Sequence, residues 1–113
     1  MQQFTDQERA LAEDIRQDII ENGRKSISDH CQDAMDETGA SVYDLAESLR
    51  HGIIIELSRQ DSGYRIVTRL DRGGTAHCAV FSEFGAAVTY WINGSDDRHE
   101  TLNLGKYNRQ AFV

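Results

Sequence analysis

The residues most able to do chemistry in this sequence are two His-Cys pairs, His30–Cys31 and His77–Cys78. A structural zinc ion takes four ligands in a tetrahedral arrangement, usually from C-x2-C or H-x3-H spacings. Neighbouring side chains point to opposite faces of a strand and diverge by about 100° around a helix, so neither pair can close on one ion. No metal site and no cofactor is therefore predicted, although ligands drawn from distant histidines stay open. Both cysteines are expected to be small buried apolar residues.

The common enzyme motifs are the next source of chemistry to consider. The sequence has no P-loop, no GxGxxG, no HExxH and no GxSxG. A Cys-His nucleophile pair stays open, because its two members can be remote in the sequence and meet only in the fold. A pair of catalytic carboxylates is not indicated, since the acidic residues fall at spacings typical of a solvent-exposed helix face.

Negative charge is concentrated in the first half of the chain. Residues 1–52 carry 12 acidic and 5 basic residues, whereas residues 53–113 carry seven of each. Nucleic-acid binding by the first half is disfavoured, because such binding draws its affinity from Lys and Arg at the phosphates. Two interpretations are open: the acids form a solvated helix face, or they bind a protein partner with a basic surface. The residues expected to contact such a partner are Glu13, Asp14, Asp18, Glu21, Asp33 and Asp36.

The first half has the pattern of three amphipathic helices. Thr5 and Glu8 form a capping-box pattern in front of apolar residues at helical spacing, which predicts a helix over Asp6–Asn22. A second helix is predicted between a capping Ser26 and Gly39, and a third between Ser41 and Gly52. The two short helices are expected to form a tight hairpin.

From Ile53 onward the pattern changes to short β-rich runs separated by turn signals: IIIEL, YRIVTRL, TAHCAVF and AAVTYWI. Sequential strands with short connections favour an antiparallel meander, because a parallel sheet needs crossover helices. In the second run, Arg65 and Arg69 are expected on the opposite face from Ile66 and Thr68. The predicted fold class is α+β, with N-terminal helices followed by a four-stranded antiparallel sheet.

The chain is expected to be a single cytoplasmic domain over residues 1–113, a length close to the commonest domain size. Its start lacks the basic and apolar regions of a signal peptide. No apolar run approaches the roughly 20 residues that a membrane helix needs, so no membrane partner is expected. Two cysteines without a secretory signal favour free thiols in a reducing compartment. Homodimerisation through a sheet edge stays open.

Residues 28–92 resemble a known family. The stretch HCQDAMDETGASVYDLAESLRHGIII looks like the start of the small bacterial domain-of-unknown-function family 4258, which is placed near the BrnT and RelE-like toxins. The helix over residues 6–22 and the tail over residues 94–113 lie outside the resemblance. It implies a RelE-like or BrnT-like version of the α+β fold. The residues that follow the family pattern are His30, Met35, Glu37, Gly39 and Gly52.

Two arginines of the family pattern are replaced, by Ala34 and Thr38. The resemblance implies that RelE-like ribonucleases work without metals, through side chains that hold the RNA phosphate and stabilise developing charge. The favoured hypothesis is therefore a non-catalytic, acidic binding protein of the inhibitor or immunity type. One alternative is a metal-independent endoribonuclease toxin of a toxin–antitoxin pair, and a further alternative is an uncharacterised interaction domain. The residues that a ribonuclease would use are Arg65, Arg69, His77, Lys106, Tyr107 and Arg109.

Overall fold

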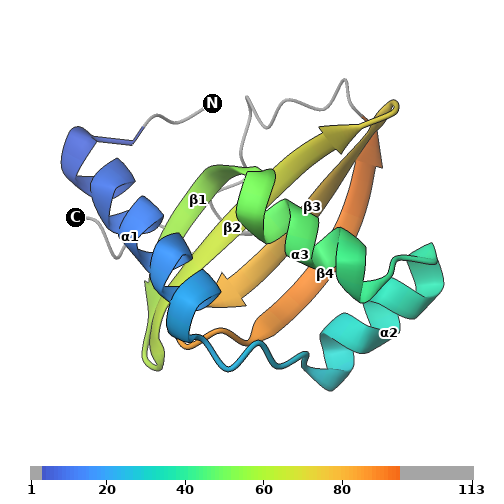
Figure 1. The fold of residues 1–113 in the computed structure, drawn as a ribbon, viewed down its shortest axis with the longest axis horizontal. Coiled ribbons are helices and arrows are strands. Elements are labelled where there is room, and N and C mark those ends of the chain that lie inside the picture. The colour runs from blue at the N-terminus through green and yellow to red at the C-terminus, as the bar shows by residue number, and fades with distance from the viewer. Residues whose placement is uncertain (1–3, 95–113) are drawn as a thin grey trace.

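The computed structural model describes residues 4–94, which fold into three helices packed on a four-stranded antiparallel sheet (Figure 1). This arrangement confirms the predicted α+β class and the order of its elements. Lys106, Tyr107 and Arg109 lie outside the described residues. None of the described helices combines the length and hydropathy that a membrane span requires. The elements are α1 (Asp6–Asn22), α2 (Asp29–Thr38), α3 (Val42–His51), β1 (Ile53–Gln60), β2 (Gly63–Arg72), β3 (Thr75–Ser82) and β4 (Ala87–Gly94).

Helix α1 begins at a reciprocal capping box. The Thr5 hydroxyl accepts a hydrogen bond from the Glu8 backbone N–H at 3.1 Å, and the Glu8 carboxylate accepts one from the Thr5 N–H at 2.8 Å. Both donors would otherwise lack a partner at a helix start. One face of the helix buries Ala12, Ile15 and Ile19. Full burial of an aliphatic side chain such as Ile19 stabilises the fold by about 1.5–3 kcal/mol.

Helix α2 begins two residues later than the sequence predicts. Ser28 is the N-cap, and its hydroxyl accepts from the Cys31 N–H at 3.1 Å. Ser26 is engaged elsewhere, because its carbonyl accepts from the Ala87 N–H at 2.8 Å in a short parallel pairing of Ile27 with the start of β4. This pairing carries α2 to the β4 edge, where the helix packs mainly against that strand (Figure 1). The expectation of a tight hairpin between α2 and α3 is therefore wrong.

Helix α3 is held at both ends. Ser41 and Asp44 form a second capping box, in which the Asp44 carboxylate accepts from the Ser41 N–H at 2.9 Å. At the other end, Arg16 of α1 donates to the carbonyls of Leu49, at 3.5 Å, and Gly52. A cation bonded to the last carbonyls suits the negative end of the helix dipole. Arg16 therefore ties the first helix to the third.

The sheet is a meander in the order β1-β2-β3-β4. Its register pairs Ile66 with Phe81, and both side chains belong to the core beneath the helices. Arg65 and Arg69 alternate with Ile66 along β2, so they lie on the other face of the sheet, as the alternation predicts. The pairing shifts at one point near the start of β1 and at another near the end of β3. Such bulges bend a strand and increase its local twist.

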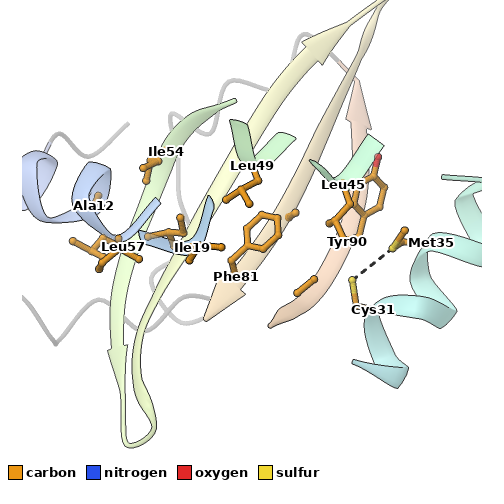
Figure 2. Close-up of a cluster of buried hydrophobic side chains, with 14 residues drawn as sticks. Ala12, Ile19, Cys31, Met35, Leu45, Leu49, Ile54, Leu57, Phe81 and Tyr90 are labelled. Atoms are coloured by element: carbon orange, nitrogen blue, oxygen red, sulfur yellow. Dashed lines mark hydrogen bonds between the residues drawn. The ribbon is translucent and has the colours of Figure 1, made fainter. Parts of the chain in front are cut away.

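The core lies between the helices and one face of the sheet, and Figure 2 shows its side chains. Leu57 of β1 and Ile19 of α1 are fully buried, and Tyr90 of β4 is 2% exposed. On the α2 side, the Cys31 sulfur lies 3.9 Å from the Met35 sulfur. Cys31 and Cys78 are both fully buried and neither forms a disulfide, which confirms the predicted burial of the cysteines.

The turn between β3 and β4 closes against the chain that follows α1. Gly85 in this turn has φ 98°, and a Cβ at that position would lie 2.7 Å from the Arg24 backbone nitrogen. The Arg24 N–H donates to the Phe84 carbonyl at 3.1 Å. Only a glycine allows the two backbones to come this close. The contact holds the segment over residues 23–28 against the β3–β4 turn.

Candidate functional site

The basic residues expected in a ribonuclease site are divided between the two faces of the sheet. Arg69 pairs with Cys78, and Leu70 pairs with His77, in the β2–β3 register. Paired residues share a face, whereas successive residues alternate. His77 therefore faces the helices, while Arg65 and Arg69 face away from them. The described residues do not bring His77 together with either arginine.

Arg65 and Arg69 lie in a charged cluster on the face away from the helices. Arg69 is 5% exposed, and its Nε donates to the Asp71 carboxylate at 3.0 Å. Glu56 is 1% exposed and lies opposite Val67, the residue between the two arginines. Charges this buried must compensate one another, because each has lost its hydration. An RNA phosphate would have to compete with the Asp71 carboxylate for Arg69.

His77 makes hydrogen-bonding contacts with three neighbouring side chains. Its Nδ1 contacts the Tyr90 hydroxyl, and its Nε2 lies 3.3 Å from the Thr75 hydroxyl. The Ser48 hydroxyl of α3 donates to the His77 carbonyl at 2.9 Å and lies 2.9 Å from the Thr68 hydroxyl. Because Ser48 has a single proton, Thr68 must be the donor in the second bond. His77 therefore sits in a network that fastens α3 to the sheet.

Asp44 and Arg72 form an ion pair at the start of α3, which the sequence reasoning missed. Arg72 Nη2 lies 2.5 Å from Asp44 Oδ1. The Ser41 N–H above all, together with Arg72, holds the pKa of Asp44 below its ordinary value of 3.8 despite the opposing effect of burial. Burial, with the nearby charge of Asp44, raises the pKa of Tyr90 to about 12. Tyr90 is therefore a neutral hydrogen-bonding phenol at ordinary pH.

The cysteines and histidines of the described residues do not converge on one point. Cys31 faces the helix-covered core, whereas Cys78 shares the other sheet face with Arg69. His30 is exposed on α2. Over residues 4–94, no group of three His, Cys, Asp or Glu side chains is placed to hold a metal ion. Burial raises the pKa of the Cys31 thiol, which makes it a poor nucleophile.

The acidic residues expected to contact a partner fall on two separate helices. α1 lies over β1 and β2, α3 over β2 and β3, and α2 beside β4, so the two acidic helices are at opposite ends of the helical layer (Figure 1). On α1, Asp14, Asp18 and Glu21 are exposed and recur at spacings of four and three residues. They form one stripe along the helix, here called the α1 acidic stripe. On α2, Asp33 and Asp36 are exposed as well.

Glu13 differs from the other acids of α1. Its carboxylate accepts from Arg16, with Nη2 at 2.6 Å from Oε1 and 2.7 Å from Oε2. Arg16 in turn bonds the end of α3. Glu13 is therefore part of the link between the two helices and does not belong to the α1 acidic stripe.

A cavity of about 110 Å³ opens between the end of α1, helix α3 and residues 23–28. Lys25 and Arg50 line it, and both are exposed. Lys25 has φ 54° and is the one non-glycine residue with positive φ among those the structure describes. Sequence reasoning missed this cavity because its walls come from segments far apart in the chain. The apolar wall includes Ile19, Ile27, Leu45, Leu49, Phe81 and Ala87.

Comparison with family models, with curated proteins and with solved structures finds no match to this chain. The likeness to family 4258 therefore stays a prediction from the sequence. Function has to be inferred from the residues and their arrangement.

Proposed function

We propose that this protein is a non-catalytic binding protein that docks onto a basic surface of a protein partner through the α1 acidic stripe. The observation that carries the proposal is that the three carboxylates of this stripe are exposed and lack ion pairs with described residues. Asp14, Asp18 and Glu21 are exposed, and none of them pairs with a Lys or Arg of the described residues. In the described part of the chain, the Asp18 side chain accepts only from the Asn22 amide, at 3.0 Å, and that of Glu21 only from the Gln17 amide, at 2.9 Å. Within residues 4–94, no Lys or Arg compensates their negative charge.

The stripe runs to the end of the helix where negative charge is unfavourable. The C-terminus is the negative end of the helix dipole, and an acid in the last turn costs about 0.3–1 kcal/mol. The last turn of α1 has no basic residue to offset Glu21. α2 repeats the pattern, with Asp36 and Glu37 in a last turn that has no basic residue. These acids do not stabilise the fold, whereas a negative field does steer a basic partner.

The position of the basic residues favours binding over catalysis. His77 and the two arginines of β2 lie on opposite faces of the sheet, and Arg69 is paired with the Asp71 carboxylate. At the position of one missing family arginine, the Thr38 hydroxyl donates to the Ala34 carbonyl at 3.1 Å, within its own helix. An inhibitor or immunity-type role on a RelE-like fold is the class that the family resemblance adds to this proposal.

A capture experiment tests the proposal. The full-length protein would be immobilised and exposed to a lysate of its own cells at about 0.1 M salt, where surface charges act over about 10 Å. A specific partner should bind the wild type and be lost with the triple variant Asp14→Lys, Asp18→Lys, Glu21→Lys. The matched α2 variant, Asp33→Lys with Asp36→Lys, should retain it. Retention by the α1 variant would contradict the assignment of the α1 acidic stripe.

The ribonuclease alternative is separated by its own measurements. Expression of an active toxin in bacteria arrests growth, and the purified protein cleaves RNA. If wild type does both and His77→Ala does neither while keeping the helical and strand content of the wild type, the chain is an enzyme. Unimpaired growth together with intact RNA supports the binding role.

A further inference from the structure

We propose that the cavity between α1, α3 and residues 23–28 binds a small carboxylate with a compact apolar chain. The apolar chain fills the cavity, and Lys25 and Arg50 at its rim hold the carboxylate. This site is distinct from the α1 acidic stripe: it binds a negatively charged ligand, whereas the stripe binds a positively charged surface. The inference does not depend on the proposed partner.

The size of the cavity sets the size of the ligand. An apolar cavity of about 150 Å³ accommodates benzene, so 110 Å³ suits a group somewhat smaller than a phenyl ring. A branched chain of roughly three to four carbons has this bulk. Pockets for larger ligands begin at about 300 Å³. Ile19, Leu49 and Phe81 line the cavity and also belong to the packed core (Figure 2).

The open side of the cavity is held in place before any ligand arrives. Residues on both sides of Lys25 are anchored, because the Arg24 N–H donates to the Phe84 carbonyl and the Ser26 carbonyl accepts from the Ala87 N–H. Between these anchors Lys25 adopts the left-handed conformation, which a residue with a side chain seldom takes. Backbone held in this way by its surroundings is characteristic of ligand sites.

The charge of the rim selects an anion. Neither Lys25 nor Arg50 forms an ion pair or a side-chain hydrogen bond with any residue in the described part of the chain. By contrast, Arg16, Arg69 and Arg72 each pair with a carboxylate. Two cations therefore line one apolar opening in the half of the chain that is otherwise acidic. A carboxylate takes charge-assisted hydrogen bonds from both, and arginine can give two in parallel.

The ligand preference is tested by nuclear magnetic resonance on the ¹⁵N-labelled full-length protein. The probe is 3-methylbutanoate, and the matched neutral probe is 3-methylbutanamide. The carboxylate should shift the backbone amides of Ser26, Ile27, Ala46 and Arg50 with a dissociation constant on the order of 1 mM or below. The amide should bind at least about tenfold more weakly, because it lacks the charge that the rim recognises.

Substitutions separate the site from a general charge effect. Lys25→Asn, which suits the left-handed backbone, and Arg50→Gln should each weaken carboxylate binding about three- to tenfold. Arg24→Gln is the control, because Arg24 is exposed and adjacent but does not line the cavity. It should change binding less than about twofold, since screened charges outside the site contribute little. Ala46→Leu should fill the cavity and abolish binding.

Three results would overturn the inference. The first is the absence of a saturable shift with 3-methylbutanoate up to about 20 mM, which is well above the expected dissociation constant. The second is equal affinity for the acid and the amide, and the third is an equal loss of affinity in Arg24→Gln and Arg50→Gln. The first two use the wild-type protein, so they do not depend on whether any variant folds.

Discussion

Arg72 at the end of β2 pairs with Asp44 at the start of α3, with Nη2 2.5 Å from Oδ1. The same Asp44 carboxylate accepts from the Ser41 N–H at 2.9 Å and so completes the capping box of α3. One side chain therefore both begins the helix and fixes it to the sheet. The two residues are 28 positions apart, so only the fold brings them together.

Replacement of Asp44 by Asn should lower the free energy of unfolding at neutral pH by about 1 kcal/mol, since it weakens a cap and an ion pair whose Arg72 partner is partly exposed. The folded-state pKa of Asp44 lies below 3.8. Its contribution is therefore complete above that value and is lost as pH falls through the folded pKa. Urea unfolding should show a constant gap between wild type and variant from about pH 7 to pH 5, and a shrinking gap below about pH 4. A difference in unfolding free energy at about pH 3 as large as that at about pH 7 would contradict this argument. Asp33→Asn, at an exposed position, is the control.

The Ser48–Thr68 pair should behave as a coupled unit in the core. Both residues are fully buried. Ser48→Ala alone should cost about 1–3 kcal/mol of unfolding free energy, because it leaves the Thr68 hydroxyl and the His77 carbonyl without their partner. Thr68→Val replaces a hydroxyl by a methyl of similar shape. In the double variant the two losses should be less than additive by about 1 kcal/mol, measured by chemical denaturation of all four proteins. Strict additivity would mean that the hydroxyls do not interact.

Tyr90 should ionise at a higher pH than an ordinary tyrosine. Burial raises its pKa from 10.0 to about 12. A raised pKa favours the protonated phenol in the folded state, so its contribution to stability is complete below pH 10 and is lost as pH rises towards 12. The tyrosinate absorbance of wild type minus that of Tyr90→Phe isolates this group. The difference should rise with a midpoint near 12; a midpoint near 10 would show that the phenol is not desolvated.

In the α1 acidic stripe, a substitution that stabilises the fold should weaken binding of the partner. Glu21→Lys should raise the free energy of unfolding by about 0.3–1 kcal/mol, because a cation suits the C-terminal end of the helix dipole. Asp6→Lys is the matched reversal in the first turn and should lower it by a similar amount. Urea unfolding at low salt measures both, and added salt should diminish both effects. Stabilisation of the fold together with loss of the captured partner would identify Glu21 as a binding residue; a destabilised Glu21→Lys would contradict the dipole argument.

Helix ends were predictable where local chemistry alone decides them. Thr5 with Glu8, and Ser41 with Asp44, satisfy backbone donors within one turn, so their helices begin where the pattern predicts. Ser26 and Ser28 offer the same hydroxyl two residues apart. The choice of Ser28 depends on two backbone hydrogen bonds with Ala87, about 60 residues away in the chain: the Ser28 N–H donates to the Ala87 carbonyl, and the Ala87 N–H donates to the Ser26 carbonyl.

The sequence by itself determined the α+β class, the antiparallel meander, the alternation of Arg65 and Arg69 with Ile66, and the burial of both cysteines. These features follow from periodicity, caps and turns, which act over a few residues. Tertiary structure alone decided that His77 lies on the opposite face from the arginines, that Asp44 meets Arg72, and that an apolar cavity opens beside Lys25 and Arg50. Each of these is a contact between distant segments, and such contacts are set by how whole helices pack on the sheet, not by any local pattern.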